Sequence, residues 1–161
     1  MIAKISQSLI DEYADWHWFG VIDGDPRLVA LYRRHYSADP AVSSASQREH
    51  GVSGVGESKC FMTSACDAGF IWVLNTTERY DGQTGIQCSF FRNEGHTLSS
   101  VLILEAEELA WIHWGRRRLW TYVNPTAVRH KRDPGRCFLK AGWRQCGVSK
   151  AGLVILEKPP R

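Results

Sequence analysis

The stretch that decides the fold is residues 85–114, GIQCSFFRNEGHTLSSVLILEAEELAWIHW. Its first seven residues alternate between small or polar and apolar side chains, which predicts a β-strand. Farther on, apolar residues recur at the helical spacing of about 3.6, at Leu98, Leu102, Ala106, Leu109 and Ile112. The residues between the two patterns, 92–97, contain a glycine. The sequence therefore predicts a strand, a short Gly-bearing loop and a helix in that order.

This order of elements predicts an anion site in the loop. The first N–H groups of a helix have no partner inside the helix, and the helix dipole adds positive potential at the same end. Arg92 adds a full positive charge next to them. The predicted ligand-binding residues are Arg92, Asn93, Gly95, Thr97, Ser99 and Ser100. Hydroxyl groups of this set also suit a purely structural role, because Thr97, Ser99 and Ser100 can cap the helix.

The rest of the chain divides into short elements. Helices are expected at 2–13, 27–36 and in the few residues up to 142, and strands at 16–22, 59–66, 69–77, 118–123, 143–147 and 152–157. Asp-Gly at 81–82 marks a turn before the 85–91 strand. Residues 38–58 show no hydrophobic period and are expected to form a mobile loop over a site. The prediction is one α/β (α+β) domain over 1–161, with a mixed, mainly antiparallel central sheet flanked by helices.

Composition limits the class of protein. The chain has 161 residues, 43% of them hydrophobic, and includes seven tryptophans, so it can bury one sizeable core. It lacks an apolar run of about 18 residues and a signal-peptide pattern, so we expect a cytoplasmic location. Its five cysteines form no C-x-x-C pair, and six histidines are scattered. We therefore expect reduced, mostly buried thiols and no cysteine nucleophile. No residues have the spacing of metal ligands, which leaves only a metal site assembled from distant residues.

Charge is distributed unevenly along the chain. Residues 1–114 carry 8 Lys and Arg against 15 Asp and Glu, a net charge of −7, whereas 115–161 carry 12 against 2, a net charge of +10. Double-stranded DNA or a phosphate-rich cofactor would suit the basic third, although solvated surface charges would give the same pattern. The residues predicted to contact nucleic acid are Arg129, Lys131, Arg132, Arg136, Lys140 and Arg144.

The layout resembles the GNAT (acyl-CoA N-acyltransferase) fold. The residues that carry the resemblance are the strand, loop and helix of 85–114 and the Ala-Gly-Trp step at 141–143 before a final strand pair. The pyrophosphate loop of that fold follows Arg/Gln-x-x-Gly-x-Gly/Ala. Here Arg92 and Gly95 match, and Thr97 departs from the last position. The resemblance implies acetyl-CoA or another acyl-CoA as cofactor.

Two departures concern the chemistry of acetyl transfer. Many GNAT acetyltransferases have a Tyr general acid in the short last helix, five residues before the aromatic of the Gly-aromatic step. In this sequence that position is Phe138, which has no proton to donate. The Asn often found seven residues earlier is Lys131. Ordinary acetyl transfer therefore needs another proton donor.

A narrower resemblance is to the Mom family of phage proteins, which have the GNAT fold and add a carbamoylmethyl group to N6 of adenine in DNA. It rests on His35-Tyr36-Ser37, Arg92-Asn93, Ser99-Ser100 and the run 121–124 before the Ala-Gly-Trp step. By position, the resemblance implies functional roles for Tyr36, Arg92, Ser99 or Ser100, and Asn124. The family usually has Asp at the last position, and Asn keeps its shape without the negative charge.

Modification of a nucleobase would require several of these side chains to bind the base. An enzyme that modifies an exocyclic amine must hold the base by stacking and by hydrogen bonds to its edge. We expect Tyr36, Trp72, Tyr122 and Asn124 to do so, with His35 beside them. Three of these residues also suit a purely structural role. Trp72 would pack in the core, and His35 and Tyr36 would pack at a helix end.

The sequence thus supports one main interpretation and two alternatives. The main one is a DNA-modifying enzyme similar to the Mom family, with Tyr36, Ser99, Asn124, Arg92 and His35 as catalytic residues. The first alternative is an acyl-CoA-dependent N-acyltransferase of a small amine or peptide. The second is a non-catalytic DNA-binding or host-interaction protein with the same fold.

Overall fold

The computed structural model describes residues 16–75, 81–127 and 133–160, and is built around a seven-stranded sheet of order β1-β2-β3-β4-β5-β7-β6. Neighbouring strands are antiparallel except β4 and β5, which are parallel. This is the mixed, mainly antiparallel sheet that the sequence predicts. The strands are β1 (Trp18–Val21), β2 (Glu57–Thr63), β3 (Ala68–Asn75), β4 (Gly85–Asn93), β5 (Leu119–Val123), β6 (Arg144–Val148) and β7 (Val154–Lys158). The helices are α2 (Pro26–Arg33), α3 (Ser44–His50), α4 (Ser99–Trp114) and α5 (Arg136–Lys140).

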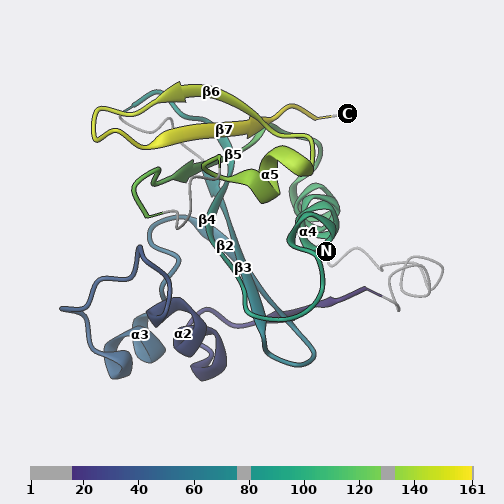
Figure 1. Ribbon diagram of the computed structural model, residues 1–161. Coiled ribbons are helices and arrows are strands. Elements are labelled where there is room, and N and C mark those ends of the chain that lie inside the picture. The colour runs from purple at the N-terminus through teal and green to yellow at the C-terminus, as the bar shows by residue number, and fades with distance from the viewer. Residues whose placement is uncertain (1–15, 76–80, 128–132, 161) are drawn as a thin grey trace.

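Helices cover both faces of the sheet (Figure 1). On one face, α4 and α5 pack against a large cluster that includes Phe70, Trp72 and Trp143. On the other face, α2 packs through Leu28 and Leu31 against a smaller cluster that includes Ile71 and Phe90. Because both of its faces are covered, β3 is buried from Ala68 to Leu74. A strand with no exposed face reads as a continuous apolar run, as this one does.

Helix α2 begins and ends at recognisable signals. The Asp25 side chain accepts a hydrogen bond from the Arg27 backbone N–H at 2.9 Å, and Pro26 occupies the first turn, where its missing N–H costs nothing. The helix ends at Arg33, three residues before the end predicted from the apolar spacing. The residues after it, His35 and Tyr36, leave the helix and turn toward the end of β5.

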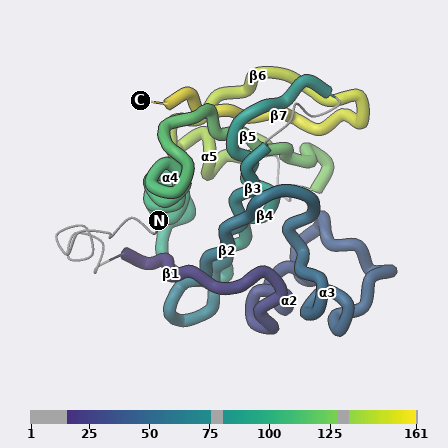
Figure 2. Tube along the Cα trace, turned by 180° about the vertical axis from the view of Figure 1, so that it is seen from behind, coloured from purple at the N-terminus to yellow at the C-terminus, as the bar shows by residue number. Residues whose placement is uncertain are grey.

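The segment 38–58 is not structureless. It contains α3, whose N-cap Ser43 accepts a hydrogen bond from the Ser46 N–H, and α3 packs beside α2 (Figure 2). The Asp23 carboxylate then accepts hydrogen bonds from the Val52 and Ser53 N–H groups, which fixes the end of the segment. The prediction of a long loop without regular structure was wrong, because α3 is defined by a cap and not by an apolar stripe. The helix predicted at 2–13 lies outside the described residues.

Helix α4 confirms the predicted helix, but Leu98 and Ile112 of the predicted apolar stripe are exposed and the predicted cap is absent. Its N-cap is Leu98, with no side-chain hydrogen bond, so Thr97, Ser99 and Ser100 do not cap it. Indole N–H groups fix it to the sheet, since Trp18 donates to the Leu102 carbonyl and Trp72 to the Ala106 carbonyl, each at 2.8 Å. Trp72 is 0% exposed, so the idea that it stacks on a base was wrong and the packing alternative is correct.

Strands β4 and β5 run together for only three residue pairs and then separate. The paired residues are Ile86–Cys88 and Leu119–Thr121. Beyond them β4 continues to Asn93 and β5 to Val123. The edge of β4 that faces β5 therefore has no strand partner past Cys88, and a gap opens between the two strand ends. Within the described ranges, no helix is long and apolar enough to cross a membrane.

Candidate active site

A cleft of about 500 Å³ lies where β4 and β5 separate. Residues 87–91 of β4 form one wall and residues 121–124, at the end of β5, form the other. The cleft is closed by His35, Tyr36 and Ser37 after α2, by Gly135, Cys137 and Phe138 at α5, and by Leu153. None of residues 38–58 lines it, so that segment does not form the predicted cover in this structure.

Phe138 forms an apolar wall of the cleft. It is buried, and its ring lies edge-on to Trp143, with ring centroids 4.8 Å apart, and to Phe91 at 6.0 Å. The turn before it requires a glycine, because Gly135 has a φ of 71° and a Cβ there would lie 2.5 Å from Leu156 Cδ1. Phe138 therefore shapes the cleft and supplies no proton.

Tyr36 reaches across the cleft from the end of α2 to the end of β5. Its hydroxyl oxygen accepts a hydrogen bond from the Asn124 backbone N–H at 3.4 Å, while 53% of the residue remains exposed. Loss of solvent around the hydroxyl raises the pKa of Tyr36, against the lowering effect of the Asn124 hydrogen bond. Tyr36 is therefore a neutral phenol at pH 7, and no residue in the described ranges accepts a hydrogen bond from its hydroxyl.

His35 is a neutral side chain stacked under Tyr36. Their ring centroids are 4.2 Å apart, and His35 also meets the edge of Phe90 at 5.3 Å. Burial, with a smaller effect of the nearby Arg92 charge, lowers the pKa of His35 to about 4. Its Nδ1 accepts a hydrogen bond from the Ser37 backbone N–H at 3.2 Å, so the proton of the neutral ring is on Nε2. At neutral pH His35 is a hydrogen-bond donor and not a cation.

Asn124 lies at the cleft, but its side chain is occupied. Its Oδ1 accepts hydrogen bonds from the Thr126 backbone N–H at 3.0 Å and from the Thr126 hydroxyl at 2.7 Å. This is the self-bonding turn that Asn favours after a strand. The contact with Tyr36 uses the Asn124 main chain, so the part of Asn124 that meets the proposed site does not depend on the side chain.

The loop after β4 is organised by Asn93. Its Nδ2 donates to the Thr97 carbonyl at 2.7 Å and to Ser99 Oγ at 3.0 Å, and its Oδ1 accepts from the Gly95 N–H at 2.9 Å. Gly95 therefore has no free N–H to offer an anion. A Cβ at Gly95 would lie 2.4 Å from an Asp67 carboxylate oxygen, so this position requires glycine for space. The N–H groups of the first turn of α4 remain uncapped by any side chain.

Arg92 is paired with a carboxylate in the same loop. Glu94 accepts hydrogen bonds from Arg92 Nε at 2.6 Å and from two nitrogens of Arg34 at 2.8 Å. These two guanidinium groups, Arg34 first, lower the pKa of Glu94 to about 2. The ion pairs join the end of α2 to the end of β4, and they neutralise part of the positive charge predicted for the anion site.

The predicted site residues thus fall into two groups. His35, Tyr36 and Asn124 meet in the cleft. Arg92, Asn93 and Ser99 lie together at the loop and the start of α4, but none of them lines the cleft. Gly95, Thr97 and Ser100 belong to the same loop and first helical turn, outside the cleft lining. Tyr122, which the sequence predicts to hold a base, lines the cleft, and its hydroxyl donates to Asp81.

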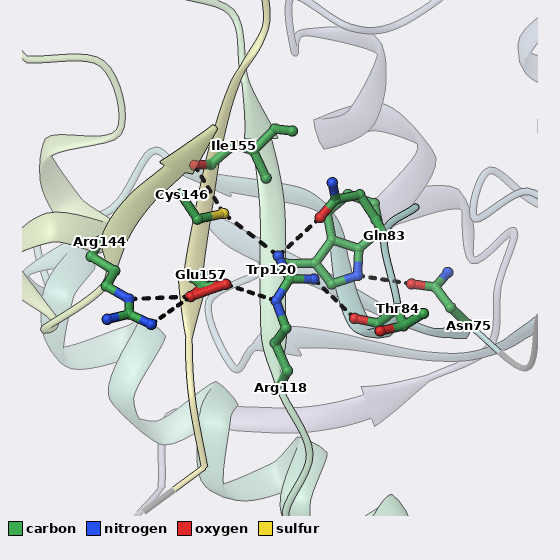
Figure 3. Close-up of polar contacts among 9 residues, drawn as sticks. All are labelled: Asn75, Gln83, Thr84, Arg118, Trp120, Arg144, Cys146, Ile155 and Glu157. Carbon is green, nitrogen blue, oxygen red and sulfur yellow. Dashed lines mark hydrogen bonds and ion pairs between the residues drawn. The ribbon is translucent and has the colours of Figure 1, made fainter. Parts of the chain in front are cut away.

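The basic residues do not form one free surface. Glu157 accepts hydrogen bonds from Arg118 at 2.9 Å and from Arg144 at 2.9 and 3.1 Å, as Figure 3 shows. Arg118 precedes β5 whereas Asn124 follows it, so this cluster lies at the far end of β5 from the cleft. Arg136 and Lys140 are exposed on α5. Arg129, Lys131 and Arg132 lie outside the described residues.

For the cleft residues Thr121 and Ser89 the sequence predicts no individual role. Thr121 Oγ1 donates to the Cys88 carbonyl at 2.8 Å, at the last pair before the strands separate. Ser89 lines the cleft with a buried hydroxyl. Thr121 belongs to the run 121–124 and Ser89 to no motif, and the role of each depends on where the two strands diverge. Among the described residues, no group of three His, Cys, Asp or Glu side chains could hold a metal ion.

The chain was also compared with known proteins. No protein-family model and no curated protein matches the sequence at a significant level. Solved structures do match. The GNAT domain of S. lividans PAT is 18% identical over 88% of each chain, with a TM-score of 0.58. An aminoglycoside acetyltransferase, AAC(6')-Ib, in complex with coenzyme A is 14% identical over 88% of this chain and 93% of that chain, with a TM-score of 0.61.

A third solved structure extends this likeness. Spermidine N-acetyltransferase from Vibrio cholerae, in complex with CoA and spermine, is 13% identical over 88% of this chain and 93% of that chain, with a TM-score of 0.57. At these identities the likeness is one of fold. It covers 88% of this chain in each of the three structures. The chain is a single domain with the GNAT fold.

Proposed function

We propose that the protein is an acyl-CoA-dependent N-acyltransferase that holds its thioester substrate in the cleft between β4 and β5. The observation that carries the proposal is this cleft, with a β4 edge that lacks a strand partner past Cys88, in a chain with the fold of coenzyme A-binding acetyltransferases. An extended ligand can hydrogen-bond to such an edge as a strand would. The proposal favours the first alternative from the sequence over DNA modification.

The start of α4 is the proposed binding site for the phosphate groups of the acyl-CoA. Its uncapped first-turn N–H groups and the positive end of the helix dipole attract an anion. Ser99 and Ser100 would contribute N–H groups, and Arg92 its remaining charge, whereas Gly95 is committed to Asn93. The carboxylates of Glu94 and Asp67 border this loop. Binding of a pyrophosphate would therefore require the ion pairs of Glu94 to rearrange. A substitution of Glu94 that weakens these ion pairs should raise the affinity for the pyrophosphate group.

Tyr36 is the proposed proton donor in place of the missing tyrosine at position 138. In acyl transfer the amine nitrogen bonds to the thioester carbonyl carbon, the carbon–sulfur bond breaks, and the leaving thiolate takes up a proton while the amine loses one. Tyr36 is neutral at pH 7, and its hydroxyl donates to no residue in the described ranges. Its raised pKa keeps it protonated at pH 7, which suits an acid and not a base.

The test is direct measurement of acyl transfer. Purified protein is incubated with acetyl-CoA and a panel of primary amines that includes a polyamine, an aminoglycoside, a peptide α-amine and adenosine, and release of free coenzyme A thiol is followed. Amine-dependent thiol release that matches N-acetyl product by mass spectrometry supports the proposal. Failure of acetyl-CoA to bind at millimolar concentration, measured by calorimetry, would exclude it.

DNA modification remains a second candidate because of the charge split. Residues 115–161 carry the net charge of +10, and Arg136 and Lys140 on α5 are exposed next to the cleft-lining Cys137 and Phe138. A duplex bound there would bring phosphates near the cleft. Mass spectrometry of nucleosides from cells that express the protein tests it through a new modified adenosine. Binding of DNA with neither acyl transfer nor a modified base would point to the non-catalytic alternative.

A further inference from the structure

The lining of the cleft is uncharged at pH 7 over the described residues. It contains aromatic, aliphatic, hydroxyl, amide and thiol side chains, and no Asp, Glu, Lys or Arg within those ranges. Its histidine, His35, is neutral, because burial lowers its pKa to about 4. An ammonium group in this cleft would lose its hydration without gaining a charged partner, which is unfavourable.

Two carboxylates near the cleft already have partners. Asp81 accepts a hydrogen bond from the hydroxyl of the cleft residue Tyr122. Glu94 forms ion pairs with Arg34 and Arg92. An ammonium that approached either carboxylate would compete with a contact that the folded chain already makes.

Aromatic rings gather on the side of the cleft that faces α2. On β5, Leu119 and Val123 belong to the cluster beneath α4, so the alternation along the strand turns Tyr122 to the opposite face. His35 and Tyr36 follow α2, and their ring centroids lie 4.2 Å apart. Aromatic side chains favour stacked or edge-on contacts with a second flat ring. Since α4 and the proposed phosphate site lie on the other face, the amine would enter from the α2 side and meet these rings.

We propose that the acyl acceptor is an aromatic amine, with its amino group attached directly to a flat ring that packs against Tyr36 and Tyr122. The proposal rests on the proposed function, because it names the substrate class of the same cleft. The nitrogen of such an amine is neutral at pH 7, since its lone pair is shared with the ring. The nitrogen bonds to the thioester carbonyl carbon, and the carbon–sulfur bond breaks.

The protons of this reaction balance without a charged base. The nitrogen loses one proton and the leaving thiolate takes up one, so Tyr36 can give its proton to the sulfur and receive the proton that the nitrogen releases. An alkyl amine needs one more step. With the ordinary lysine pKa of about 10.4, fewer than about one molecule in a thousand is neutral at pH 7, so a proton must leave first.

The experiment uses four amines that separate the effect of the ring from the effect of the charge. At pH 7 aniline is aromatic and neutral, and benzylamine is aromatic and an ammonium. Trifluoroethylamine is neutral without a ring, and cyclohexylamine is an ammonium without an aromatic ring. With saturating acetyl-CoA, kcat/KM for aniline should exceed that of each other amine at least about tenfold. Release of coenzyme A thiol and the mass of the N-acetyl product measure it.

Replacement of one ring tests where the amine binds. Tyr122→Leu should raise KM for aniline about two- to tenfold, the range expected for one lost aromatic contact, and change acetyl-CoA binding by less than about twofold. Tyr122→Phe keeps the ring and should recover most of this loss. Phe19→Leu, at a partly exposed ring on β1 outside the cleft, is the matched control and should keep the wild-type KM.

The outcomes separate this proposal from the proposed function. Faster acetylation of benzylamine or cyclohexylamine than of aniline, or transfer to none of the four amines while acetyl-CoA is bound, would overturn the aromatic amine and leave acyl-CoA binding in place. Equal rates for trifluoroethylamine and aniline, or an unchanged KM in Tyr122→Leu, would overturn the role of the rings. If acetyl-CoA does not bind, the proposed function fails and the substrate class fails with it.

Discussion

At the scale of single residues, the hydroxyl of Tyr36 is the group on which the proposed chemistry depends. Tyr36→Phe removes that oxygen and keeps the ring that stacks on His35. We expect kcat for acyl transfer to fall at least about tenfold, with stability changed by less than about 1 kcal/mol, because the lost hydrogen bond is long and partly exposed. Steady-state kinetics and thermal melting check the two halves of this prediction.

The same change at Tyr32, which lies on α2, serves as the control. Tyr32 packs against Phe90, with ring centroids 5.6 Å apart, and does not line the cleft. Tyr32→Phe should leave kcat within about twofold of the wild type. Equal losses in Tyr36→Phe and Tyr32→Phe, or no loss in either, would show that the Tyr36 hydroxyl takes no part in the reaction.

His35 makes a separate prediction about pH and stability. Its folded pKa of about 4 lies below the ordinary value of 6.5, so between these values the unfolded chain binds the proton more readily. Its contribution to stability is complete above pH 6.5 and is lost as the pH falls to about 4. We expect a loss of about 2 kcal/mol, since each unit is worth about 1.4 kcal/mol and part of the ring is still solvated.

Denaturant unfolding at several pH values, for the wild type and His35→Gln, measures this contribution. His113, whose pKa is also lowered by burial, is present in both proteins, so the difference between them isolates His35. Glu94, with a pKa of about 2, loses its contribution only at lower pH. Parallel pH curves for the two proteins would contradict a neutral, buried His35.

At the scale of elements, a buried ion pair links α4, α5 and β7. Lys158 is 4% exposed and pairs with Glu107, which is 1% exposed, and its ammonium donates to the Ala141 carbonyl at 2.7 Å. Removal of one partner leaves a charge in an apolar interior. Glu107→Gln should therefore cost about 3 kcal/mol of unfolding free energy, whereas Glu108→Gln on the exposed side of α4 should cost under about 0.5 kcal/mol.

The double variant Glu107→Leu with Lys158→Met removes both charges together. It should recover most of the loss, because apolar side chains of similar size fit a buried interface without a desolvation cost. Denaturant unfolding of the single and double variants measures the coupling between the two positions. Additive losses in the double variant would mean that the two charges do not depend on each other.

The elements show which features a sequence can predict. The strand at 85–91 and the helix that follows it are predicted correctly, because apolar residues recur in each with the period of its structure. The predicted apolar stripe of the helix is buried only in part, since Leu98 and Ile112 are 71% and 46% exposed. The helical pattern predicts Glu107 on the outer side of α4 with Glu105 and Glu108, but Glu107 is buried. The pattern misses this because the ion-pair partner, Lys158, is 51 positions farther along the chain. The separation of β4 and β5, and with it a bulge of β4 at Ser89, depends on long-range pairing that no local pattern contains.

The site was predicted in part for the same reason. His35, Tyr36 and Asn124 meet at the cleft, whereas Ser99 and Arg92, which the sequence places in the same catalytic group, do not line it. Local motifs, however, do not show how polar groups are already paired. The Asn93 side chain accepts a hydrogen bond from the Gly95 N–H. Glu94 forms ion pairs with Arg92 and Arg34. The Asn124 side chain accepts a hydrogen bond from the Thr126 hydroxyl. Predicted site residues whose polar groups are already paired in this way stabilise the loop, and the remaining ones can contact a ligand.

At the scale of the whole molecule, the basic C-terminal third predicts salt-dependent binding of DNA. Each phosphate contact contributes close to one unit to the slope of log affinity against log salt. Replacing Arg136 and Lys140 together by Ala should lower that slope by about 2, whereas Arg144→Ala should lower it by less than 1, because Glu157 already holds Arg144. Gel retardation over a range of salt measures these slopes. Absence of any retardation at low salt would exclude double-stranded DNA as a partner.

The central claim is that the cleft between β4 and β5 binds an acyl-CoA, and two cysteines of this chain test it most directly. Cys137 lines the cleft, whereas Cys146 is exposed on β6 beside Arg118, at the far end of β5. The rate of alkylation of each thiol is measured by mass spectrometry with and without saturating acetyl-CoA. We predict that acetyl-CoA slows alkylation of Cys137 at least about fivefold and leaves Cys146 unchanged, because a bound ligand covers only the first. Identical rates at Cys137 with and without acetyl-CoA would contradict the claim.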